Sequence, residues 1–219
     1  MAIVHRYRRA GLELDLDRVL SSGVLLRDYF GTEGLRGRRC IVLGTQDSAD
    51  YVTDAGGVVV ASDDENAEVV VVADQSGYPF LETVDDVATV VLRRIERGVK
   101  TRLILANPDL VYPRASGVFG VAAGAVAAML EAILLLRDPS AVHGFARLGK
   151  PHPEMFAAAV RRLSGPDRQR MVMLGDQLRT DIVGAVNFGI ESVLVLSGID
   201  RLADVATSEI RPTHTLRRL

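Results

Sequence analysis

Apolar runs rich in valine, isoleucine and leucine alternate along this chain with stretches of helical character, and this alternation restricts the fold more than any other feature. The runs cover residues 38–44, 57–61, 68–74, 101–107, 170–176 and 191–197. Continuous apolar runs are typical of strands buried on both faces, as in parallel sheets. Helices are expected at 2–10, 22–30, 47–55, 84–97, 122–137, 153–163 and 179–188. The pattern predicts an α/β fold with a mostly parallel sheet.

Charge and composition exclude several classes of protein. Lys plus Arg is 26 and Asp plus Glu is 28, so the net charge of −2 predicts no grip on nucleic acid or on an anionic membrane. Residues 118–136 approach the length of a membrane span, but Gly and Ala fill their first half and Glu131 lies within them. We expect a helix packed in a soluble core. A single cysteine, Cys40, opens an apolar run, so we expect a buried thiol and a reducing, cytoplasmic location.

Two loop-like stretches suggest the domain organisation. Residues 34–39 are rich in Gly and Arg, and residues 106–117 combine Pro and Gly after a strand. The stretch between them has about the smallest size that folds as a domain. We therefore expect a domain at 37–105, inserted into a core made of residues 1–36 and 106–219.

The stretch MVMLGDQLRTDI, residues 171–182, carries the sharpest chemical signal. Asp176 directly follows an apolar strand, and Asp181 follows five residues later in the adjoining loop. Ligands of open parallel sheets bind beyond the carboxyl ends of the strands, so the two carboxylates are placed to converge there. Paired carboxylates suit Mg²⁺, which prefers oxygen ligands. The alternative for Asp181 is that it caps the helix that follows.

A second signal is RLGKPHPEMF, residues 147–156, where Lys150 precedes a helix that begins at Pro153. The first turn of a helix has unpaired N–H groups and a positive dipole, which attract phosphate. The alternative is a surface lysine in a loop. Lys150 and Asp176 are separated by one helix and one strand, however, and this spacing brings both to the same edge of a sheet.

Together these stretches resemble a known family. GKPHPEMF followed by GDQLRTDIVGA resembles the third and fourth motifs of the haloacid dehalogenase (HAD) superfamily, closest to its NagD-type, p-nitrophenyl-phosphatase-like branch. ILANPD, residues 104–109, resembles the hinge by which that family's chain leaves its cap domain. The resemblance covers the chain from about residue 10 onward. It implies a HAD-like Rossmannoid core with an inserted α/β cap of the C2 type, at 37–105.

The resemblance also implies a chemistry, the Mg²⁺-dependent hydrolysis of a small phosphorylated metabolite. Lys150 would face the phosphate, and Asn107 and Lys150 would contact the substrate. Asp176 would bind Mg²⁺, and Asp181 would bind it directly or through water. Cap residues set the substrate in this family, which points to residues 74–80 and 109–120, where Tyr78 and Phe80 either line the pocket or belong to the cap core.

The family also requires a first motif, Asp-x-Asp-Gly, in which the first aspartate attacks phosphorus and the second acts as general acid and base. Asp15 and Asp17, in LELDLDRVLSSG, are the candidates. Arg18 replaces the family's Gly, and the residues before Asp15 do not resemble a buried strand. The surrounding segment also resembles a later part of the family's sequence, in which neither aspartate is catalytic. A chain read in this way lacks the nucleophile motif and has a truncated active site.

Three functions are consistent with this reading. The first is a HAD-like phosphatase, with Asp15 and Asp17 as nucleophile and acid. The second is a non-catalytic relative that binds Mg²⁺ or a phosphorylated ligand. The third is a partner-dependent subunit, for instance of a homo-oligomer. Without the family's first strand, a neighbouring core strand lacks a ladder partner. Three outcomes are then open. The sheet could close with an altered strand order, another chain could cover the unpaired strand, or the protein could have low stability.

Overall fold

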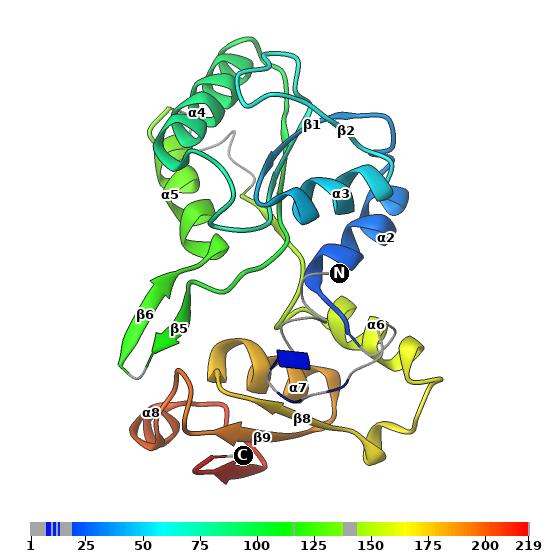
Figure 1. Cartoon of the computed structure of the whole chain (residues 1–219), viewed down its shortest axis with the longest axis vertical. Helices are drawn as coiled ribbons and strands as arrows, with labels where there is room; N and C mark the ends of the chain where they lie inside the picture. The colour runs from blue at the N-terminus through cyan, green and yellow to red at the C-terminus, as the bar shows by residue number, and fades with distance from the viewer. Residues whose placement is uncertain are drawn as a thin grey trace.

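The computed structural model describes residues 8–9, 11, 13, 19–115, 117–137 and 144–218 of the 219. Two α/β units lie one above the other along the longest axis (Figure 1). The large unit contains the helices and strands between residues 22 and 147, and the small unit those between residues 153 and 216. The predicted α/β class with a mostly parallel sheet is confirmed.

The large unit is built on a five-stranded parallel sheet in the order β2-β1-β3-β4-β7. The strands are β1 (Arg39–Leu43), β2 (Val58–Val59), β3 (Val69–Val72), β4 (Arg102–Leu105) and β7 (Ala146–Arg147). All four residues of β3 are buried. Their alternate side chains enter two different cores, because Val70 and Val72 point to one face and Val69 and Val71 to the other. The continuous apolar runs of the sequence arise from this burial on two faces.

Helices cover both faces of this sheet (Figure 1). On one face lie α2 (Leu25–Thr32), which follows the 3-10 turn η2 (Ser22–Val24), and α3 (Gln46–Asp54). On the other face lie α4 (Phe80–Glu96) and α5 (Ala123–Leu135). Helix α5 is the alanine-rich segment, and it buries Val126, Ala127 and Leu130 in the core, as predicted. In the part of the chain that the structure describes, no helix is long and apolar enough to cross a membrane.

A two-stranded antiparallel hairpin, β5 (Val111–Ala115) and β6 (Val118–Val121), connects β4 to α5. The sequence reading expected only a loop here. The sequence does not predict a strand here because Pro113 has no N–H to donate to a ladder. The pairing is also irregular, with a register shift between Pro113 and Ala115. Every residue of β5 is exposed, so this hairpin contributes little to either core.

The small unit contains a three-stranded parallel sheet in the order β10-β9-β8. The strands are β8 (Val172–Gly175), β9 (Glu191–Val195) and β10 (His214–Leu216). Its helices are α6 (Pro153–Arg162), α7 (Val183–Phe188) and α8 (Leu202–Thr207), with the turns η3 (Arg168–Arg170) and η4 (Leu178–Ile182). Phe156 of α6 stacks on Phe188 of α7, with ring centroids 5.5 Å apart. Both aromatic rings pack near Met173 of β8.

Strand β8 is the edge of this sheet, and β9 is its one partner within the described residues. Val172 and Leu174 are 48% and 45% exposed, although β8 is the apolar strand that leads to Asp176. Val172 and Leu174 lie on the same face of β8, whereas Met173 on the opposite face packs against α6 and α7, so only one face of the strand is covered.

The two units share a packed contact. Leu148 and Ala158, from the loop after β7 and from α6, lie in the same apolar cluster as Leu25 and Phe30 of α2. The predicted domain limits at residues 36 and 105 remain predictions. Helix α5 and strand β7, which that division assigns to the core, nevertheless pack on the sheet of the large unit.

Candidate functional site

Lys150 and Asp181 meet in a direct ion pair at the junction between the two units. The Lys150 Nζ atom donates to Asp181 Oδ1 at 2.6 Å. Lys150 lies between β7 and α6, and Pro153 is the first residue of α6, as predicted. Asp181 lies on η4, a π-helical turn where the sequence reading expected regular α-helix from residue 179. Segments that are distant in sequence thus bring an ammonium and a carboxylate together.

The Asp181 carboxylate is almost fully buried (1% exposed), and both of its oxygens are engaged. Oδ1 accepts a hydrogen bond from the Lys150 Nζ atom. Oδ2 accepts hydrogen bonds from the backbone N–H groups of Asp176 and Gln177 at 3.0 and 3.1 Å. Asp181 therefore fixes the loop that carries Asp176 and orients the Lys150 ammonium. These three hydrogen bonds use both acceptor positions of Oδ2 and one of Oδ1, so one acceptor position remains on Oδ1.

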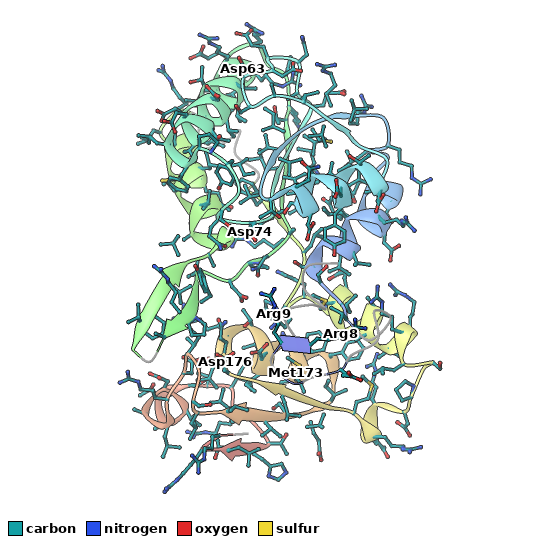
Figure 2. All side chains as sticks on the ribbon, viewed as in Figure 1. Arg8, Arg9, Asp63, Asp74, Met173 and Asp176 are labelled. Carbon is teal, nitrogen blue, oxygen red and sulfur yellow. The ribbon has the colours of Figure 1, made fainter. Side chains whose placement is uncertain are left out.

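Asp176 directly follows Gly175, the last residue of β8, and is half-buried at the carboxyl end of the strand. Its Oδ2 accepts the backbone N–H of Ile199 at 3.1 Å. Among the residues that the structure describes, Oδ1 has no hydrogen-bond partner. Figure 2 shows Asp176 in the small unit and Asp74 at the end of the large unit nearest to it.

Two glycines make room for these carboxylates. A Cβ atom on Gly175 would lie 2.3 Å from the Asp181 side chain, and one on Gly198 would lie 2.0 Å from Asp176 Oδ2. Both distances are far below any normal contact, so the carboxylates pack directly against backbone. The sequence reading treated neither glycine as part of the site.

Asp200 also holds this loop, and the sequence reading missed it. Its Oδ2 accepts the backbone N–H of Leu178 at 2.5 Å, and its own N–H donates to the carbonyl oxygen of Asp176 at 3.0 Å. The loop after β9 is thereby tied to the loop after β8. The available signal was that Asp200 also follows a strand that ends at this edge of the sheet.

Asp109 is a further carboxylate of this site that the sequence reading did not single out. Burial raises the pKa of its carboxyl group, more than the neighbouring Lys150 ammonium lowers it, and the Asp181 and Asp176 carboxylates raise it further. For Lys150, burial is the largest single influence and lowers the pKa, but the Asp181, Asp109 and Asp176 carboxylates together outweigh burial and the net shift is upward. Lys150 therefore remains an ammonium ion in this setting.

For the other predicted site residues, the structure gives a position but no evidence of a role in the site, or does not describe the residue. Asn107 Oδ1 accepts the backbone N–H of Asp109 at 3.2 Å, which shapes the loop after β4, so its role in substrate binding remains a prediction. Asp15 and Asp17 lie outside the described residues. Tyr78 packs against the core of the large unit, whereas Phe80 is 42% exposed.

Within the described ranges, no group of three or more His, Cys, Asp and Glu side chains could hold a metal ion. The donor chemistry nevertheless fits Mg²⁺, which is usually bound through one or two carboxylates, water and substrate phosphate. Asp176 Oδ1 supplies a carboxylate oxygen of this kind.

A cavity of about 420 Å³ lies away from these residues, at the amino ends of the strands of the large unit. Glu33, Arg38, Lys100 and Arg102 are among its lining residues. Arg38 pairs with Glu68 and Arg102 with Glu33, so its charges are largely compensated. We assign the chemistry to the Lys150 site, because ligands of parallel sheets bind at the carboxyl ends of the strands.

Comparisons with known proteins agree with this geometry. Residues 147–219, which contain Lys150, Asp176 and Asp181, match a family model described as HAD-hydrolase-like. A solved structure from Cytophaga hutchinsonii, described as a possible sugar phosphatase of the HAD superfamily, superposes with a TM-score of 0.83 at 28% identity. That match covers 99% of this chain and 77% of the other. The last third of the chain thus matches a HAD-hydrolase-like family, and the whole chain is similar in fold to a structure of the HAD superfamily.

Two further matches show what else this chain is similar to. Dihydroxyacetone phosphatase of Corynebacterium glutamicum is 28% identical over 98% of this chain and 70% of its own length. NagD from Escherichia coli K-12 shares the fold, with a TM-score of 0.75 at 24% identity over 99% of this chain and 77% of that protein. The predicted resemblance to HAD-superfamily proteins is thus confirmed, NagD shares the fold, and the curated relatives are named as phosphatases.

Proposed function

We propose that this protein is a Mg²⁺-dependent phosphatase that acts on a small phosphate ester. The observation that carries the proposal is the group formed by Lys150, Asp181 and Asp176 at the carboxyl end of β8. It combines a fixed ammonium with a carboxylate oxygen that is free to bind a cation. Phosphoryl transfer depends on such groups, because its catalysis is mostly positioning and charge stabilisation.

Each residue has a separate task in this proposal. Lys150 binds the phosphoryl oxygens, and Asp181 holds its Nζ atom in place while it also fixes the loop of Asp176. Asp176 would hold Mg²⁺ through Oδ1. When bound, Mg²⁺ neutralises negative charge on the phosphate oxygens.

The nucleophile of the proposed reaction is Asp15, with Asp17 as acid and base. A carboxylate oxygen of Asp15 would form a bond to phosphorus while the ester oxygen leaves with a proton from Asp17. Water would then release phosphate and restore the carboxylate. The second candidate function is a non-catalytic protein that binds a phosphorylated ligand, as a monomer or a homo-oligomer. Arg18 favours it, because it stands where the family has Gly.

Hydrolysis of p-nitrophenyl phosphate with and without Mg²⁺ separates the two functions. The variants are Asp17→Asn and Asp176→Asn, with Asp54→Asn, an exposed carboxylate at the end of α3, as the matched control. Activity that requires Mg²⁺ and disappears in the first two variants alone supports the phosphatase. If the parent protein is no more active than the variants, but phosphate still raises its melting temperature, the non-catalytic function replaces it.

A further inference from the structure

Asp109 reaches the site from the large unit, and its backbone is held firmly. Its N–H donates to Asn107 Oδ1 at 3.2 Å, and its carbonyl oxygen accepts the N–H of Gly124 at 2.9 Å. A Cβ atom on Gly124 would lie 2.7 Å from that carbonyl oxygen, so the start of α5 packs tightly on the loop. The position of the Asp109 carboxylate is thus defined by the fold.

Among the described residues, two polar oxygens at this place are buried without a hydrogen-bond partner, Asp109 Oδ1 and Thr180 Oγ1. Thr180, on η4, is only 7% exposed. Its hydroxyl group is close enough to lower the pKa of the Asp109 carboxyl slightly, yet the two oxygens do not form a hydrogen bond of normal geometry. Buried polar groups are nearly always paired, and an unpaired one is costly, so the two oxygens point to a missing partner.

The chemistry around the two oxygens restricts what that partner can be. Asp109 as a carboxylate can only accept a hydrogen bond, whereas the Thr180 hydroxyl can donate one. A second anion is disfavoured, because the Asp176 and Asp181 carboxylates are close enough to repel negative charge at Asp109. An ammonium group could donate to Asp109 but could not accept from Thr180. An alcohol hydroxyl both donates and accepts, so it suits both oxygens.

We propose that Asp109 and Thr180 bind a hydroxyl group of the substrate, so that the site selects phosphate esters of hydroxylated carbon chains over esters that lack hydroxyl groups. The inference rests on the proposed function, since it takes the phosphate to lie at Lys150. Binding energy then distinguishes the two ester classes, because a simple alkyl ester leaves both oxygens unpaired.

The test compares glycerol 1-phosphate with propyl phosphate, which differ in hydroxyl groups alone, by calorimetric titration without Mg²⁺, so that neither ester is hydrolysed during the titration. Inorganic phosphate reports on the phosphate site. We expect the parent protein to bind glycerol 1-phosphate at least about tenfold more tightly. In Thr180→Val, which removes the hydroxyl at nearly constant shape, and in Asp109→Leu, which removes the acceptor at similar size, the preference should fall to about threefold or less. Asp54→Asn should keep the full preference.

The outcomes separate the inference from the proposed function. If inorganic phosphate and both esters fail to bind the parent protein, the phosphate site itself is wrong, and the hydroxyl subsite is overturned with it. If phosphate binds and the parent does not distinguish the two esters, a water fills the gap and the inference alone is overturned. A preference that survives in both folded variants also overturns it, and circular dichroism shows whether each variant is folded.

Discussion

Replacement of Asp181 by Asn is expected to destabilise the protein strongly. The Asn side chain can keep an oxygen towards the N–H groups of Asp176 and Gln177, but its NH₂ group then faces the Lys150 ammonium. Removing one partner of a buried ion pair costs roughly 3–5 kcal/mol. The Lys150 side chain is 31% exposed, so water offsets part of that cost, and we expect a loss of about 2–3 kcal/mol.

Urea unfolding followed by far-ultraviolet circular dichroism measures this loss, provided that the slope with denaturant is unchanged. The matched control is Asp28→Asn, which breaks the exposed pair between Asp28 and Arg161 at 3.0 Å. Both side chains of that pair are more than half exposed, so a loss below about 0.5 kcal/mol is expected. A loss below about 1 kcal/mol in Asp181→Asn would refute the assignment of the pair as an anchor of the site.

The same pair predicts a pH dependence. Burial lowers the pKa of Lys150, but the Asp181 carboxylate, with Asp109 and Asp176, outweighs burial and raises the pKa in the folded protein. Its contribution is therefore fully present below the unfolded-state pKa of about 10.4 and is lost as the pH rises through the folded-state value. The stability difference between parent and Asp181→Asn should shrink above about pH 10.5, and a constant difference would contradict this explanation.

Three further changes test other parts of the structure. Gly198→Ala should destabilise by about 1–3 kcal/mol in urea, because its Cβ would meet Asp176 Oδ2 at 2.0 Å, whereas Gly31→Ala, with its nearest neighbour at 3.4 Å, should not. Cys40 is fully buried and burial raises its pKa to about 11, so it should resist a thiol reagent at pH 8 until urea unfolds the protein; rapid native labelling would contradict its burial. Burial also raises the pKa of Asp109 in the folded protein. Ionisation of this carboxyl group therefore lowers stability as the pH rises from the unfolded-state pKa through the folded-state pKa. Asp109→Asn, which stays neutral, should melt higher than the parent at pH 7 but not at pH 3.

Long apolar runs made the framework predictable. The runs at 38–44, 68–74 and 101–107 became β1, β3 and β4 because strands buried on both faces require such sequences. The helix ends were also predictable where Gly98 and Gly189 adopt positive φ, which other residues rarely do. Strands β7 and β10 were not predicted, because they are two and three residues long and partly charged or polar, and their existence depends on their neighbours in the sheet.

Part of the candidate site was also predictable. Lys150 and Asp176 were placed at one sheet edge because each comes near the end of a strand, but spacing cannot tell which carboxylate receives the ammonium. In the structure the Lys150 ammonium pairs with Asp181, and within the described residues Asp176 Oδ1 has no hydrogen-bond partner. Asp109 and Thr180 were missed because what marks them is an unsatisfied hydrogen bond, which is a property of the packed structure alone.

Strand β8 has a consequence for the dynamics of the site. Within the described residues it is hydrogen-bonded on one side, to β9, so the backbone amides on its outer side are protected by no neighbouring strand. Edge strands open at lower free energy than central ones, and amide hydrogens there exchange earlier. Asp176 therefore directly follows an edge strand, but its own N–H and that of Gln177 donate to the buried Asp181 carboxylate. Amide hydrogens on the outer side of β8 should therefore exchange earlier than those of Asp176 and Gln177.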